Sequence, residues 1–106
     1  MSRRIVAAIC DGANLSGALL ALEMLGVPST EVVRVEGVAA LRRLRGRDRD
    51  RVDGAAALRA AAHERALRGG GTLLLVPVGD EVAEKRVSLA LLRHSEGPVE
   101  VRDEET

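Results

Sequence analysis

Two stretches of the chain are apolar at nearly every position, and the rest of the pattern is arranged around them. Residues 4–10 read RIVAAIC, and residues 70–78 read GGTLLLVPV. In each stretch both faces of an extended chain are apolar, which is typical of strands in the interior of a sheet. Pro77 has no amide to donate, so it fits the last paired position of its strand.

Two further stretches alternate between apolar and polar residues. Val33 and Val35 share one face of residues 31–36, and residues 99–102 read VEVR. A half-polar face suits an edge strand, because that face can meet water. The pattern therefore predicts a four-stranded sheet with the two apolar strands in its centre.

Apolar residues spaced by three and four predict helices over residues 15–25, 53–68 and 81–95. The expected buried stripes are Leu15, Leu19, Leu22 and Leu25 or Met24 in the first helix, Ala55, Leu58, Ala62 and Ala66 in the second, and Ala83, Val87, Ala90 and Leu91 in the third. A shorter helix is possible around residues 38–44, where apolar positions also recur at this spacing.

The ends of these helices carry signals of their own. Asn14 or Ser16 can cap the first helix, and Asp80 can cap the third, because their side chains accept hydrogen bonds from free amides of the first turn. Gly26 suits the left-handed residue that follows a helix, and Pro28 prevents the first helix from continuing.

The predicted order is strand-helix-strand, a helical middle, then strand-helix-strand, in a single domain over residues 1–106 with a charged loop and helix insert at about 37–69. Two folds place the apolar strands centrally: an α+β ferredoxin-like antiparallel sheet of order 4-1-3-2, and a flavodoxin-like parallel α/β sheet of order 2-1-3-4. Glycines and an alternating charge run at 47–51 interrupt the middle segment. It therefore resembles an insertion more than a single crossover helix, which favours the antiparallel fold.

Composition narrows the classes of function. Phe, Tyr and Trp are all absent, so the core is built from aliphatic residues and no aromatic ring is available to stack on bases. Sixteen basic and sixteen acidic residues give a net charge of zero, which argues against nucleic acid and anionic membranes as partners. The single cysteine excludes an internal disulfide, and no apolar stretch has the length of a membrane helix, so we expect a cytoplasmic protein.

Few residues suggest chemistry. Cys10 ends the first strand, where a nearby cation or helix N-terminus could activate its thiol, although a small buried side chain is the simpler interpretation. Glycines 69–71 lead into a strand rather than a helix, which argues against a phosphate loop. His63 and His94 have no further ligand at metal-binding spacing, so we expect them on the surface or at helix ends.

Three arginines of the middle segment, Arg42, Arg43 and Arg45, are candidates for contact with an anion. Acidic residues at positions 48, 50 and 53 neutralise part of the same basic run. A solvated charge cluster that pairs with itself is therefore the competing interpretation. No spacing predicts a catalytic dyad or triad, a metal site or a cofactor site.

Residues 62–76, AHERALRGGGTLLLV, resemble the late part of bacterial general-stress, heat-induced YflT-type domains, in which a helix runs through a basic-Gly-Gly turn into an apolar strand. Residues 80–95 are similar to the acidic-started final helix of that family, and residues 99–104 to its closing strand. The middle segment departs from the family pattern, because it is short and rich in Arg and Asp where many members are Gly/Ala-rich and apolar. The resemblance implies a ferredoxin-like fold and a stress context, with no established activity and no catalytic residues.

We therefore expect a non-catalytic, stress-associated interaction or regulatory domain that uses no cofactor. One alternative is a sensing module similar to ACT or PII-like domains, which bind a small anionic ligand at a subunit interface; another is a small enzyme that uses Cys10. Because a ferredoxin-like fold covers one sheet face, the second apolar face needs a cover, either the helix over 53–68 or a second copy of the chain. That helix has few large apolar residues, which favours a homodimer through the second sheet face.

Replacing Leu74 or Leu75 by Ala is expected to lower the free energy of unfolding by about 2–5 kcal/mol, the usual cost of a cavity in a packed core. Replacing Arg49 by Ala, in the charge run, is expected to change it by less than about 0.5 kcal/mol. Urea denaturation of the three variants measures these changes. Comparable losses at both kinds of position would mean that the core lies elsewhere.

Overall fold

The computed structural model describes residues 2–48, 54–97 and 99–105. In chain order its elements are β1 (Ser2–Cys10), α1 (Gly12–Met24), a 3₁₀ turn (Ser29–Glu31), β2 (Val33–Glu36), α2 (Gly37–Asp48), α3 (Gly54–Arg68), β3 (Thr72–Pro77), α4 (Glu81–Leu92) and β4 (Glu100–Glu105). Arg49, the surface control proposed above, lies outside the described residues. Among the helices of the described ranges, none is long and apolar enough to cross a membrane.

The four strands form one sheet in the order β2-β3-β1-β4, and each neighbouring pair is antiparallel. Read from the β4 edge, this order is 4-1-3-2. The predicted α+β class and antiparallel sheet are confirmed, and the parallel flavodoxin-like alternative is wrong. The two apolar strands are central, with Ala7 opposite Leu75, and Pro77 is the last residue of β3 to pair, opposite Ile5.

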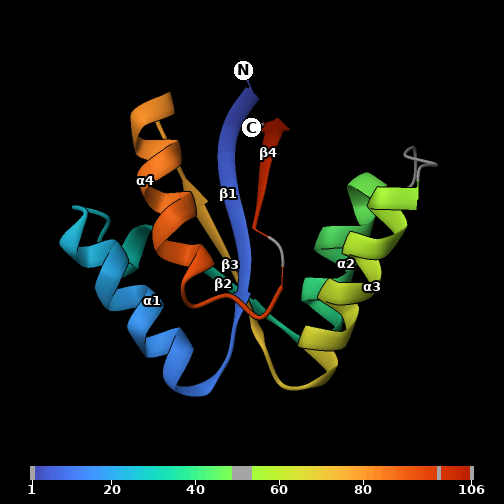
Figure 1. The fold of residues 1–106 in the computed structure, drawn as a ribbon. Coiled ribbons are helices and arrows are strands. Elements are labelled where there is room, and N and C mark those ends of the chain that lie inside the picture. The colour runs from blue at the N-terminus through green and yellow to red at the C-terminus, as the bar shows by residue number, and fades with distance from the viewer. Residues whose placement is uncertain (1, 49–53, 98, 106) are drawn as a thin grey trace.

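Helices cover both faces of the sheet (Figure 1), with α1 and α4 on one side and α2 and α3 on the other. Successive residues of a strand point to opposite faces, so β1 supplies both sides of the core. The α1–α4 side buries Val6, Ala8, Cys10, Ala18, Leu22, Val32, Leu74, Val76, Val87 and Leu91. The α2–α3 side buries Ile5, Ala7, Ile9, Ala40, Ala66, Leu67, Leu73 and Leu75.

The second sheet face is thus covered by the chain itself. Ala40 of α2 is fully buried against it, and Ala66 and Leu67 of α3 are 6% and 5% exposed. Small side chains allow the helices to pack close to the strands, so the layer needs few large apolar residues. The insert predicted at 37–69 is this two-helix layer. The homodimer through the second sheet face stays a prediction. Its motivation was an uncovered apolar face, and in the structure α2 and α3 occupy that face.

The capping residue predicted for α4 is confirmed, and the capping residues predicted for α1 are wrong. The carboxylate of Asp80 accepts a hydrogen bond from the Ala83 amide at 2.7 Å and caps α4, as predicted. In α1 the cap position is Asp11, whose backbone is extended, rather than Asn14 or Ser16. The side chain of Asp11 makes no capping hydrogen bond, so α1 begins directly after the strand without the polar signal on which the prediction relied.

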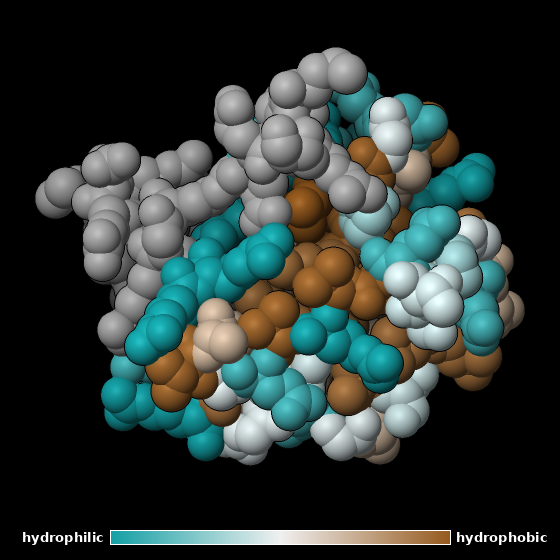
Figure 2. Space-filling model, turned by 180° about the vertical axis from the view of Figure 1, so that it is seen from behind, coloured by the Kyte–Doolittle hydropathy of each residue, from teal (hydrophilic) through white to brown (hydrophobic). Residues whose placement is uncertain are grey.

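The edge of the sheet formed by β2 faces the viewer in Figure 2, where apolar atoms gather in the centre of the face between polar ones. This strand has only four residues, and Val33 within it is 47% exposed. A short edge strand offers few free main-chain groups to an incoming strand.

A glycine turn connects α3 to β3. Gly70 has a φ of +97°, in the left-handed region that favours glycine. The amide of Gly71 donates to the carbonyl of Ala66 at 3.1 Å. A Cβ on Gly71 would lie 2.6 Å from Ile9 Cγ2 and 2.8 Å from the Ala66 carbonyl oxygen. The turn therefore ends a helix and brings the chain tightly into the sheet, instead of forming a phosphate loop.

Replacing Gly71 by Ala is expected to destabilise the protein by about 1–3 kcal/mol, because the new methyl group would overpack this contact. Gly79→Ala is the matched control, since a Cβ at Gly79 would meet nothing within 4 Å. Gly79→Ala should change the free energy of unfolding by less than about 0.5 kcal/mol. Thermal unfolding followed by circular dichroism compares the two, and equal stability would contradict the close approach at Gly71.

Candidate functional site

Cys10, the candidate thiol, is fully buried at the end of β1. Burial, reinforced by the negative charges of Asp11 and Glu96, raises the pKa of the thiol to about 11. Because the thiolate is the nucleophilic form of cysteine, a thiol with this pKa is almost entirely unreactive at neutral pH. Cys10 belongs to the core beneath α1 and α4, which agrees with the simpler interpretation of this residue.

Two carboxyl groups meet beside this thiol. A side-chain hydrogen bond with Asp11 raises the pKa of Glu96, and desolvation and the charge of Asp11 add to the effect. The amide of Glu96 donates to the carbonyl of Ile9 at 2.8 Å, which fastens the loop after α4 to the end of β1. The local charge is negative, so this end of the sheet disfavours both a thiolate and an anionic ligand.

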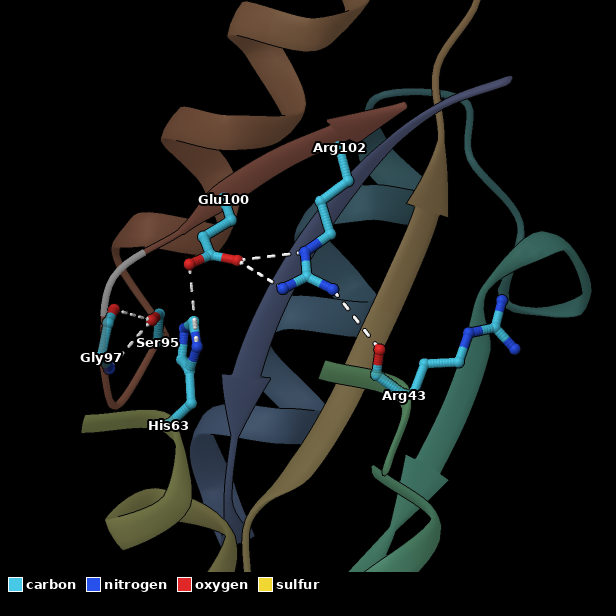
Figure 3. A network of polar contacts seen from close by, with 6 residues as sticks. All are labelled: Arg43, His63, Ser95, Gly97, Glu100 and Arg102. Atoms are coloured by element: carbon cyan, nitrogen blue, oxygen red, sulfur yellow. Dashed lines mark hydrogen bonds and ion pairs between the residues drawn. The ribbon is translucent and has the colours of Figure 1, made fainter. Parts of the chain in front are cut away.

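The arginines proposed for anion contact lie on α2. Arg42 and Arg43 are exposed, whereas the side chain of Arg45 is outside the described part of the structure. Figure 3 shows that the side chain of Arg43 points away from the polar network that its carbonyl group joins. An anion site formed by these three residues stays a prediction.

A buried polar network connects β4 to α3 and α2, and Glu100 lies at its centre (Figure 3). Its Oε2 accepts a hydrogen bond from Arg102 Nε at 3.1 Å and lies 3.1 Å from Nη2. Its Oε1 lies 3.9 Å from Nδ1 of His63, which is beyond direct hydrogen-bond distance. Arg102 Nη1 also approaches the carbonyl oxygen of Arg43, at 3.5 Å.

The network is well suited to a structural role. The side chains of His63, Glu100 and Arg102 are only 3%, 14% and 8% exposed. Charges at this depth are tolerated when they are paired, and removal of one partner leaves the other without compensation. The contacts hold the edge strand β4 against the α2–α3 layer, and the covered side chains present little surface to a substrate.

Sequence reasoning missed this network, and the prediction of a surface or helix-end position is wrong for His63, which is 2% exposed within α3. The strand register supplies the reason. Glu100 lies opposite Ala7 and Arg102 lies opposite Ile5, so these two polar residues of β4 share the sheet face that α2 and α3 cover. The alternation in residues 99–102 is the signal that could have revealed the network, once a second helix layer is assumed.

Exposed apolar side chains gather on the other helix pair. Among the described residues, six of the nine exposed large apolar side chains lie on α1, α4 or the residue after α1. We call them the α1–α4 surface: Leu20, Met24, Leu25, Val82, Leu89 and Leu92, with exposed fractions of 41–82%. Met24, one of two alternatives for the buried stripe of α1, is 82% exposed, because Ala18 and Leu22 occupy the side that faces the sheet.

A groove of about 380 Å³ crosses this surface between the two helices. Its lining consists of Ala21, Met24, Leu25, Arg86, Leu89, Ala90, Arg93 and His94. His94 is half-buried two residues beyond the end of α4, the helix-end position predicted for it. A Cβ on Gly17 would lie 2.8 Å from the His94 ring, so a glycine in α1 allows the imidazole to pack between the helices.

Comparisons with known proteins found no match among family models, curated proteins or solved structures. The resemblance to YflT-type domains therefore stays a prediction. Within residues 2–48, 54–97 and 99–105, no group of three or more His, Cys, Asp or Glu side chains could hold a metal ion. The groove and the apolar surface around it are thus the candidate site that the geometry itself provides.

Replacing Glu100 by Ala is expected to destabilise the protein by about 3–5 kcal/mol, because Arg102 would lose its buried carboxylate partner. Arg68→Ala is the control. Its ion pair with Glu64 is shorter, at 2.7 Å, but the Arg68 side chain is 74% exposed, so the loss should stay below about 1 kcal/mol. Urea denaturation measures both variants, and equally small losses would show that the Glu100 network contributes little to stability.

Proposed function

We propose that this chain is a non-catalytic interaction domain that binds another protein through the α1–α4 surface. The observation that carries the proposal is the concentration of exposed apolar side chains on one helix pair. Contiguous apolar surface often marks a contact site on a soluble domain. Full burial of one such side chain contributes about 1.5–3 kcal/mol, so a partner that covers several of them gains a large driving force.

Two further features support a role without catalysis. The thiol of Cys10 is buried with a raised pKa, and the polar network around Glu100 is covered. The resemblance of residues 62–76 to bacterial YflT-type domains adds a stress-associated context in the cytoplasm to the proposal.

A second candidate is a sensing domain for a small anion, in the manner of ACT or PII-like modules. The observation in its favour is the presence of Arg86 and Arg93 in the groove lining. Such modules bind their ligand between subunits, so this candidate requires a homodimer. The exposed α1–α4 surface is better placed for that contact than the second sheet face, because α2 and α3 already cover the latter.

A photocrosslinking amino acid at position 24 is expected to form covalent adducts with a second protein in cell extract, because Met24 is 82% exposed within the proposed contact surface. The same amino acid at position 34, which is exposed on the edge strand β2, is the matched control. Adducts that are equally abundant at both positions, or absent at position 24, contradict the proposal.

A thermal-shift screen with nucleotides, amino acids and metal ions separates the two candidates. A ligand that binds the folded state raises Tm, so a clear rise with an anionic compound favours the sensing domain. The interaction domain predicts an unchanged Tm across the same panel.

A further inference from the structure

We infer that the groove between α1 and α4 binds an acidic amphipathic helix of a partner protein. This inference rests on the proposed function and names the chemistry of the partner. It follows from the position of the groove between two helices, its apolar lining and the sign of the charges within it.

The position and lining of the groove suit a helix. Residues 21–25, at the end of α1, and residues 86–94, on and just after α4, line the groove, and these two helices lie side by side (Figure 1). Five of its eight lining residues are apolar: Ala21, Met24, Leu25, Leu89 and Ala90. Met24 and Leu89 are 82% and 62% exposed, one on each helix, so they form two apolar walls. An amphipathic helix that lays its apolar face between such walls is an established mode of recognition.

The charges in the groove have one sign. Arg86, Arg93 and His94 contribute to the lining, and no acidic residue does. Arg4 on the neighbouring strand β1, by contrast, is paired within the chain, because it lies 2.7 Å from Glu84. Over the described part of the chain, Arg86 and Arg93 have no such ion pair. An unpaired cation beside apolar surface favours a partner that brings a carboxylate.

The spacing of the two arginines defines the partner further. Arg86 lies on α4, and Arg93, seven residues later, caps its C-terminal end with helical backbone angles. This spacing corresponds to two helical turns, or about 10 Å along the axis. A partner helix that lies along α4 can match them with acidic residues that are also seven positions apart. Its apolar anchors would then recur at three- and four-residue spacing between these acids.

The charges disfavour one other occupant of the groove, and its position between two helices disfavours a second. In a two-fold symmetric contact centred on the groove, a second copy of the chain would bring Arg86 and Arg93 against the same residues of its partner, and like charges would repel. An anionic bilayer would satisfy the arginines, but its surface cannot enter a recess between two helices as a single helix can.

The test uses two fluorescent peptides that share their apolar positions. Each has about 16 residues, because shorter isolated helices are only marginally stable in water. One peptide carries Glu at the two positions seven residues apart, and the other carries Lys there. Fluorescence anisotropy at low ionic strength is expected to show at least about tenfold tighter binding of the Glu peptide by the wild-type chain. The preference should shrink in high salt, because exposed charges are screened.

Charge exchange provides the decisive comparison. Arg86→Glu/Arg93→Glu should lose the Glu peptide and gain the Lys peptide, an outcome that a misfolded protein cannot produce. Arg34→Glu/Arg42→Glu removes as many exposed cations outside the groove and should retain the wild-type preference.

Several results would overturn the inference. Equal affinity for both peptides, or no binding of either, removes the acidic helix as occupant. Sedimentation of the protein with phosphatidylglycerol vesicles, without binding of either peptide, would identify a membrane as the occupant instead. A dimer in light scattering that Leu89→Glu dissociates would identify a second copy of the chain. If position 24 still crosslinks a second protein while the Glu peptide fails, only the identity of the occupant is wrong; if both fail, the proposed function falls as well.

Discussion

The central strands β1 and β3 are apolar on both faces, and both faces must therefore be removed from water. Without any aromatic side chain, the chain covers them with two layers of helices whose contacts depend on small residues. Ala40 and Ala66 face the sheet on one side, and Ala18 does so on the other. Backbones must approach closely for such a core to reach normal packing density. The tight entry at Gly71 is one result of this demand.

Covering the second face has a cost at the edge of the sheet. Glu100 and Arg102 of β4 lie on that face, so the α2–α3 layer buries them as well. The chain meets this by pairing Glu100 with Arg102 and placing His63 of α3 nearby. On the opposite side of the molecule, α1 and α4 each use only one side against the sheet, and exposed apolar side chains lie on their outer sides. The Glu100 network and the α1–α4 surface therefore lie on opposite sides of the sheet.

Sequence pattern predicts much of this fold, because two-residue alternation and three-to-four-residue spacing report burial directly. The apolar strands and the Asp80 cap follow from it, whereas the antiparallel prediction depended on the interrupted middle segment and on the resemblance to YflT-type domains. The candidate site does not, because a pattern cannot distinguish two apolar sides of one helix: Leu22 is buried and Met24 is exposed, yet both fit an apolar stripe. His63 was misplaced for a related reason, since an Ala-rich helix gives little indication of which side faces the sheet.

The position of the α2–α3 layer within the chain also bears on how the protein folds. Glu36 at the end of β2 pairs with Thr72 at the start of β3, and the whole of residues 37–71 lies between them. Antiparallel neighbours in many sheets are joined by a tight turn that forms quickly. Here the strands can meet only when a long loop closes, and contacts between residues distant in sequence slow folding. The edge strand and the helical layer are therefore linked in time as well as in space, and we expect the pairing of β2 with β3 and the docking of α2 and α3 to occur in a single step.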